Sequence, residues 1–99
     1  MSERDVDQNV RKLREEIAEV DRAILDVVNA RIELVARIRS YKASVGLPFV
    51  DTDRERELIA ALGEENAGPL SPEGLRELYT YLLDLTKREV GSDGKRRED

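Results

Sequence analysis

The chain has 99 residues, which make one domain at most; a lone domain of this size buries only part of its surface, so a core shared between subunits would help. It has no cysteine and no histidine, which excludes disulfides, thiolate metal ligands, cysteine nucleophiles and the commonest general base. A net charge of −5, with one Phe, three Tyr and no Trp, argues against nucleic-acid binding. No apolar run is long enough to cross a membrane and no signal peptide opens the chain, so we expect a cytoplasmic protein.

Helix-forming residues dominate and no segment alternates with the period of a strand, so the sequence predicts an all-α fold with three helices. The first helix is expected from about Asp7 to about Ser44, because no Gly or Pro interrupts it before the Gly46-Leu47-Pro48 turn. We expect one domain over residues 10–90, flanked by mobile tails at residues 1–9 and 91–99.

An apolar stripe runs along this long first helix and is interrupted once. Its three-four spacing keeps one face of the helix turned toward a partner. Its members are Val10, Leu13, Ile17, Val20, Ile24, Val27, Arg31, Leu34, Ile38, Tyr41 and Val45. Arg31 has no carboxylate one helical turn away, and a guanidinium against apolar side chains is costly unless an anion meets it. Two interpretations stay open: a polar residue that sets the register or pairs with another helix, and a buried site for an anionic small molecule.

The length of the first helix predicts the assembly. A helix of 38 residues is about 57 Å long, whereas a compact chain of this size is only about 35 Å wide. The apolar stripe cannot be buried along that length by the same chain. We therefore expect an obligate, intertwined homodimer with two-fold symmetry.

The second helix is expected to begin at Asp51 or Thr52 and to reach about Glu65, with Gly68 suited to a left-handed cap behind it. Its predicted inner face consists of Leu58, Ile59 and Leu62.

The third helix is expected to be capped by Ser71, with Pro72 in its first turn, and to end at Gly91. Its predicted apolar seam consists of Leu75, Leu78, Leu82 and Leu85.

Three cations of the first helix, Arg14, Arg39 and Lys42, also lack an acidic residue one turn away. For Arg39 the sequence suggests no role. Arg31 and Lys42 lie on nearly the same face, about 16 Å apart along the axis, so their side chains could close on a small ligand between them. Arg14 lies about 25 Å from Arg31, and could reach that ligand only from an antiparallel partner.

A charged cluster, Asp51-Thr52-Asp53-Arg54-Glu55-Arg56, opens the second helix. Thr52 and Glu55 fit a capping box and acidic residues suit a helix start, so capping explains Asp51 and Glu55. Capping does not explain Arg54, because a cation in the first turn is mildly unfavourable.

The order and spacing of these residues resemble the AroQ class of chorismate mutases, from about residue 10 to about residue 90. The resemblance rests on Leu13-Arg14-Glu15-Glu16-Ile17, Asp21, Arg31, Lys42, Pro48, Asp51-x-Asp53-Arg54-Glu55-Arg56 and Asn66-x-Gly68-Pro69. Members of that class are intertwined all-α dimers with two active sites. The resemblance implies conversion of chorismate to prephenate by a Claisen rearrangement, which needs no nucleophile, metal or cofactor, so a chain without His or Cys can perform it.

The resemblance also implies residue roles. Arg14 of the partner subunit would bind one substrate carboxylate, and Arg31 would bind the other. Lys42 would donate to the ether oxygen of the breaking bond. The backbone of Asp51 and the side chain of Glu55 would hold the ring hydroxyl. Catalysis would thus fall to Arg31, Lys42 and Glu55.

Three further positions complete the implied site. Arg54 would support the carboxylate cluster, and Thr86 stands where the family usually has Ser or another small polar residue. Val90 departs from the family, which places Gln or Glu there to help Lys42 hold the ether oxygen. Either Glu89 takes over this contact, or the site has one polar contact fewer, or Val90 simply packs at the helix end.

Two other functions stay open. Isochorismate-pyruvate lyases and 4-amino-4-deoxychorismate mutases resemble this class and share its first-helix cations; Asp51 and the Arg54-Glu55 pair favour chorismate. A non-enzymatic helical dimer or adaptor would use Arg31 only to fix register. Some small members of the class are activated by docking on the first enzyme of the shikimate pathway, and the sequence shows no interface of this kind.

Overall fold

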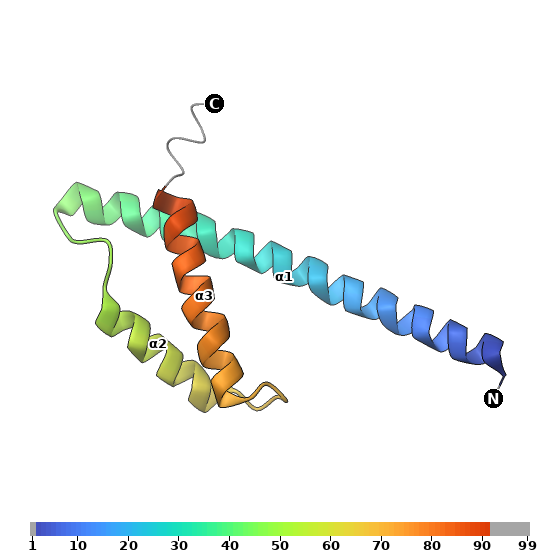
Figure 1. Ribbon diagram of the computed structural model, residues 1–99. Coiled ribbons are helices and arrows are strands. Elements are labelled where there is room, and N and C mark those ends of the chain that lie inside the picture. The colour runs from blue at the N-terminus through green and yellow to red at the C-terminus, as the bar shows by residue number, and fades with distance from the viewer. Residues whose placement is uncertain (1, 92–99) are drawn as a thin grey trace, which may run out of the picture. The chain divides into compact units, whose positions relative to one another are not determined.

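The computed structural model describes residues 2–91 and consists there of three α-helices without a strand (Figure 1). Helix α1 spans Glu3–Val45, α2 spans Thr52–Glu65 and α3 spans Pro72–Gly91. The predicted all-α fold with a long first helix is confirmed. No helix of the described residues is both long enough and apolar enough to cross a membrane.

Helix α1 begins at Glu3, earlier than the predicted Asp7. The reason is local: the Ser2 hydroxyl accepts a hydrogen bond from the Asp5 amide at 3.3 Å, and Glu3 and Asp5 place negative charge in the first turn. Residues 3–9 are therefore helical. The predicted mobility of the N-terminal tail stays a prediction, and the predicted C-terminal tail from residue 92 onward lies outside the described residues.

The end of α1 follows the predicted turn. Gly46 has a φ of 78°, a left-handed conformation that glycine adopts without steric cost. The Leu47 amide then donates to the Lys42 carbonyl at 2.8 Å, which closes the last turn. The chain leaves the helix axis at this point and reaches α2 after a short connection.

Helix α2 is capped differently from the prediction. Asp51 is the N-cap, and its carboxylate accepts a hydrogen bond from the Arg54 amide at 3.0 Å. The capping box of Thr52 and Glu55 is thus wrong, because Asp51 already satisfies the exposed amide. Gly68 is not a left-handed cap either, since Gly46 is the glycine with positive φ in the described chain.

Helix α3 begins as predicted, with the Ser71 hydroxyl accepting from the Gly74 amide at 3.0 Å. Its buried face is rotated from the predicted seam: Leu78 is exposed, and the buried residues are Leu75, Leu83, Thr86 and Val90. Leucines lie on more than one side of this helix, so their spacing does not determine which side meets the same chain.

The chain divides into two compact units, Met1–Arg31 and Ile32–Asp99. The described part of the first unit belongs almost entirely to α1, and α1 has no buried residue. Five apolar side chains of the predicted stripe are 52–63% exposed there: Leu13, Ile17, Val20, Ile24 and Val27. The described part of the chain leaves this apolar stripe exposed to solvent.

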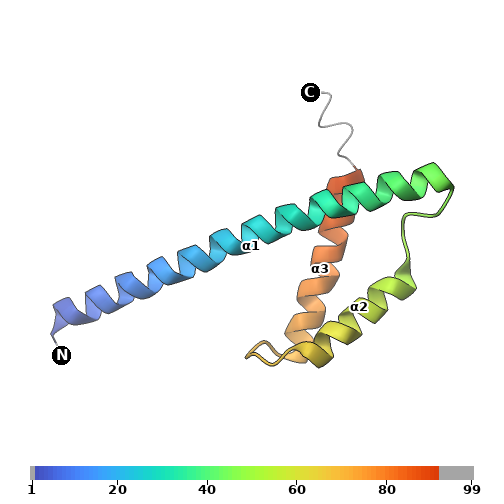
Figure 2. The ribbon, with the colours of Figure 1, turned by 180° about the vertical axis from the view of Figure 1, so that it is seen from behind.

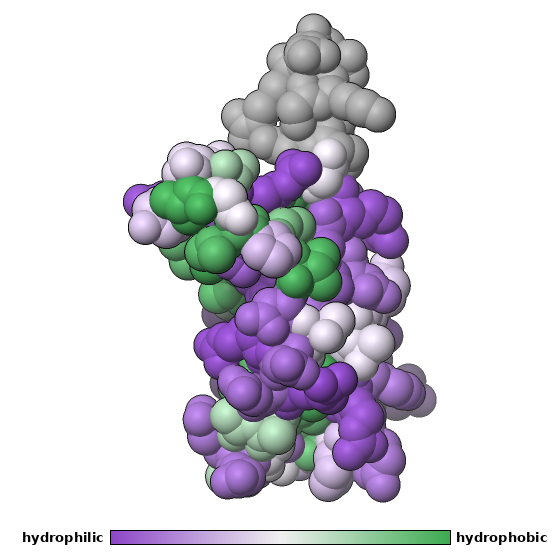
Figure 3. Space-filling view, turned by 90° about the vertical axis from the view of Figure 1, so that its left-hand side faces the viewer, coloured by the Kyte–Doolittle hydropathy of each residue, from purple (hydrophilic) through white to green (hydrophobic). Residues whose placement is uncertain are grey.

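The second unit contains the last turns of α1 together with α2 and α3, and the C-terminal end of α3 lies beside these turns of α1 (Figures 1 and 2). Arg39 makes this contact: its Nη1 donates to the Val90 carbonyl at 3.0 Å. The same guanidinium lies over the ring of Phe49, 5.5 Å from its centroid. Apolar surface also gathers over the last turns of α1 and the connection to α2, where Tyr41, Val45 and Leu47 are exposed (Figure 3).

Arg39 is expected to contribute to stability. Replacing Arg39 with Met removes one charged hydrogen bond and one cation–π contact, so we expect the free energy of unfolding to fall by about 1–2 kcal/mol. Chemical denaturation at a fixed protein concentration measures this change. The matched control is Arg37→Met, an exposed arginine two residues earlier on the same helix, which should change stability by less than about 0.5 kcal/mol. Equal effects of the two substitutions would contradict the assigned role.

Candidate active site

Lys42 lies in the last turn of α1 and is half-buried. Its ammonium group donates to the Phe49 carbonyl at 3.2 Å. A cavity of about 370 Å³ lies beside it, lined by Lys42, Leu47, Pro48, Val50, Asp51 and Thr52. The structure thus brings together two of the predicted site residues, Lys42 and Asp51, on either side of the connection between α1 and α2.

Asp51 accepts hydrogen bonds from the first turn of α2 with both its side chain and its backbone. Its carboxylate accepts from the Arg54 amide, and its carbonyl accepts from the Glu55 amide at 3.1 Å. Arg54 follows in the first turn, where its side chain is exposed. These two hydrogen bonds fix Asp51 at the first turn of α2.

Glu55 faces α3 and forms an ion pair that the sequence did not predict. Its two carboxylate oxygens lie 3.2 and 2.9 Å from the ammonium group of Lys87, and both side chains are about three-quarters buried. Asp84 lies three residues before Lys87, 3.9 Å away. In the sequence, Asp84 lies one helical turn from Lys87, so the spacing predicts an ordinary surface ion pair between these two residues. The spacing therefore gives no sign that Lys87 contacts Glu55.

Thr86 and Val90 are both buried in the second unit, at 1% and 2% exposure. The Thr86 hydroxyl donates its proton to the Leu82 carbonyl of its own helix at 2.7 Å. In this conformation the hydroxyl can accept a hydrogen bond from a ligand but cannot donate one. The Val90 carbonyl is the acceptor for Arg39, and its side chain packs in the core. Glu89, the suggested substitute for Val90, is half-buried.

The remaining predicted residues, Arg14 and Arg31, belong to the N-terminal unit. Arg14 is exposed, whereas Arg31 is half-buried. They are about 25 Å apart along the helix, so the two arginines of one chain cannot hold the same small molecule. Within residues 2–91 no group of three or more acidic side chains is placed to hold a metal ion.

Comparison with known proteins identifies the family. The model of the family described as chorismate mutase type II matches residues 13–90. A bifunctional chorismate mutase/prephenate dehydratase from Aquifex aeolicus (strain VF5) is 33% identical over 89 residues, which is 82% of this chain and 25% of that protein. A T-protein from Enterobacter agglomerans is 40% identical over 53 residues, 54% of this chain and 14% of that protein. The chain spans about a quarter or less of these curated relatives.

Two solved structures of a chorismate mutase from Thermus thermophilus have the same fold. Form I has a TM-score of 0.77 and 35% identity, covering 79% of this chain and 98% of that one. Form II has a TM-score of 0.80 and 32% identity, covering 84% of this chain and 94% of that one. The chain belongs to the chorismate mutase type II family, and the family predicted from the sequence is confirmed.

Asp51 provides a test of how the site is built. Replacing Asp51 with Ala removes the N-cap acceptor, so we expect a loss of about 1 kcal/mol in the free energy of unfolding, whereas Asp51→Asn should retain most of it. Chemical denaturation of the three proteins measures the difference. Asp53→Ala is the control, because Asp53 forms an exposed pair with Arg56 on the same helix. Equal losses for the two alanine variants would argue against the capping role.

Proposed function

We propose that the protein is an enzyme that converts chorismate to prephenate. The observation that carries this proposal is the family match over residues 13–90, a segment that contains every predicted site residue. A cavity lined by both Lys42 and Asp51 supports it. We also propose that it acts in the cytoplasm.

The proposed reaction breaks a carbon–oxygen bond and forms a carbon–carbon bond within one molecule. The chain therefore needs no nucleophile and transfers no proton. Its task is to hold a flexible dianion in the reactive chair conformation and to stabilise the charge that gathers on the ether oxygen. Two separate arginines suit two carboxylates, because each guanidinium binds one carboxylate in a bidentate fork.

Lys42 is proposed to act on the ether oxygen. Its ammonium group has three donors, of which the Phe49 carbonyl takes one. That bond fixes the direction of the side chain next to the cavity and leaves two donors for a ligand. Val90 is proposed to leave the ether oxygen with one polar contact fewer than in other members of the family, because an apolar side chain cannot donate.

We propose that the enzyme is a two-fold homodimer in which each site takes Arg14 from the partner subunit and Arg31 from the chain that supplies Lys42. The exposed apolar stripe from Leu13 to Val27 supports the dimer, because a second copy would cover it. The separation of Arg14 and Arg31 along the helix supports the shared site. Both arginines are then available to one dianion.

The competing substrates differ at the ring. An isochorismate-pyruvate lyase or a 4-amino-4-deoxychorismate mutase would use the same cations, so Arg31 and Lys42 do not distinguish them. A ring hydroxyl can donate to the carboxylate of Glu55 and accept from a backbone amide at Asp51, as the resemblance implies. Chorismate is therefore the substrate that we propose.

The direct test follows the loss of chorismate with purified protein, using wild type and Arg31→Leu. Loss of one bidentate carboxylate contact should lower kcat/KM about a hundredfold or more, while the protein remains a folded dimer. A wild-type protein with no activity toward chorismate would overturn the proposal. An Arg31→Leu protein with unchanged activity and equal or greater stability would instead support a register-setting role in a helical dimer.

The shared site is tested by mixing two inactive variants. Arg14→Ala and Lys42→Ala damage opposite contributions to the same site, so each heterodimer rebuilds one intact site. Random exchange of subunits should restore about a quarter of the wild-type activity, since half of the dimers are mixed and each has one working site. Mixing Lys42→Ala with Lys42→Met is the control and should restore none. Absence of recovery after demonstrated subunit exchange would contradict sites built from two chains.

A further inference from the structure

We propose that Lys87 is a specificity-determining positioning residue, which balances the charge of Glu55 so that this part of the site takes a neutral ring hydroxyl in preference to an ammonium group. The proposal rests on the proposed function, because it assumes that Glu55 faces the ring substituent of a chorismate-like dianion. Lys87 itself need not touch the ligand. It acts through the carboxylate of Glu55.

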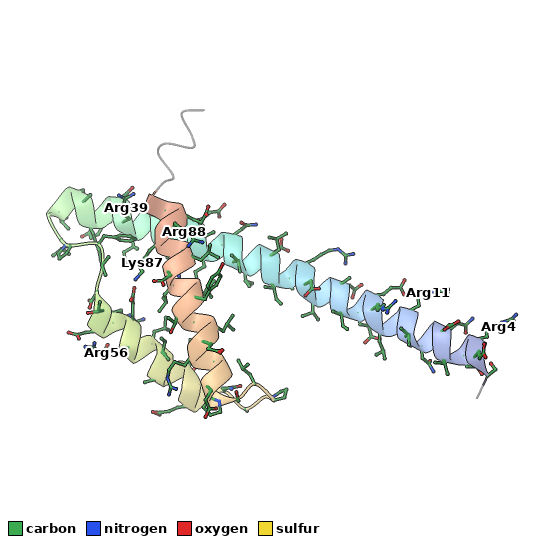
Figure 4. All side chains as sticks on the ribbon, in the orientation of Figure 1. Arg4, Arg11, Arg39, Arg56, Lys87 and Arg88 are labelled. Carbon is green, nitrogen blue, oxygen red and sulfur yellow. The ribbon has the colours of Figure 1, made fainter. Side chains whose placement is uncertain are left out.

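The geometry is that of a two-oxygen contact between helices. The ammonium group of Lys87 lies 2.9 Å from one oxygen of Glu55 and 3.2 Å from the other. Figure 4 shows Lys87 extending from α3 toward α2, which carries Glu55. The contact holds the carboxylate in one orientation, yet a carboxylate with four lone-pair sites can still accept a hydrogen bond from a hydroxyl.

Burial gives this ion pair more weight than a surface pair. The side chains of Lys87 and Glu55 are 27% and 24% exposed, so water screens their attraction only in part. Asp84 also approaches Lys87, at 3.9 Å, but its side chain is 70% exposed and correspondingly screened. The charge of Lys87 is therefore matched chiefly by Glu55, and the two together are close to neutral.

This charge balance distinguishes two classes of ring substituent. A hydroxyl is neutral and needs only an acceptor, which the paired carboxylate provides. The amino analogue carries an alkylamine in place of the hydroxyl, and such an amine is protonated at neutral pH. A lone Glu55 would attract that ammonium group, whereas the cation of Lys87 cancels the attraction. Lys87 thereby favours chorismate over 4-amino-4-deoxychorismate.

The experiment measures selectivity in Lys87→Met and Lys87→Gln. The readout is kcat/KM for chorismate divided by that for 4-amino-4-deoxychorismate; if the analogue is not turned over, its inhibition constant replaces the second value. We expect both neutral variants to shift this ratio toward the amino analogue by about tenfold, while Lys87→Arg stays within about threefold of wild type. Circular dichroism establishes that each variant is folded.

Charge balance predicts one further result. The double variant Glu55→Gln/Lys87→Met removes both charges, so its selectivity should return to within about threefold of wild type even though its absolute rate is low. A role of Lys87 in stability alone would not produce this recovery. Two controls, Arg56→Met and Asp84→Asn, change the net charge at side chains that are 74% and 70% exposed, and should leave the ratio within about twofold.

The outcomes separate this inference from the proposed function. A wild-type protein that converts chorismate, with an unchanged ratio in both neutral Lys87 variants, overturns the inference and leaves the proposed function standing. A Lys87→Gln protein with wild-type selectivity, beside a shifted Lys87→Met protein, also overturns it, because a hydrogen bond rather than charge would then decide. A wild-type protein without activity toward chorismate overturns the proposed function first.

Discussion

Phe49 joins the last turns of α1 to the connection that leads to α2. Two cations of α1, three residues apart on one face, contact this residue: Lys42 donates to its carbonyl and Arg39 lies over its ring. Arg39 also donates to the Val90 carbonyl at the end of α3. One turn of α1 therefore fixes the connection to α2 and the last turn of α3. The two contacts at Phe49 hold the connection that lines the cavity beside Lys42 and leads to Asp51.

The same contacts explain two features of the sequence: the absence of an acidic residue one turn from Arg39, and the apolar residue at position 90. Arg39 lacks an acidic neighbour because its partners are a carbonyl and an aromatic ring, neither of which a charge pattern reveals. Val90 can be apolar because the last turn of α3 is tied to α1 through its backbone, and its side chain fills the core. Few side chains of the described residues are buried, so a packed valine at this position contributes to stability. A glutamine here would bury its amide group, which costs free energy unless the amide finds hydrogen-bond partners.

The residues of the proposed active site are distributed over both units. The C-terminal unit supplies the cavity, Lys42, Asp51 and the Glu55–Lys87 pair, whereas the N-terminal unit supplies Arg14, Arg31 and an uncovered apolar stripe. Each unit alone lacks part of what a dianion with two carboxylates requires. Formation of a dimer would bury the apolar stripe, which is favourable. The same association would bring Arg14 of the partner subunit to the site.

The sequence by itself determined the helical class, the bounds of α2 and α3 to within a residue, and the family, because hydrophobic period, capping residues and motif spacing are local properties. It also singled out Lys42, Asp51 and Glu55, whose residue types suit an anionic, hydroxyl-bearing ligand. The roles of all the predicted site residues stay predictions: Arg14, Arg31, Lys42, Asp51, Arg54, Glu55, Thr86 and Val90. Only the tertiary structure decided which side of α3 is buried, that Asp51 rather than Thr52 caps α2, and that Lys87 pairs with Glu55. These outcomes depend on residues far apart in the chain or on the exact geometry of a turn, which the local pattern of residue types does not specify.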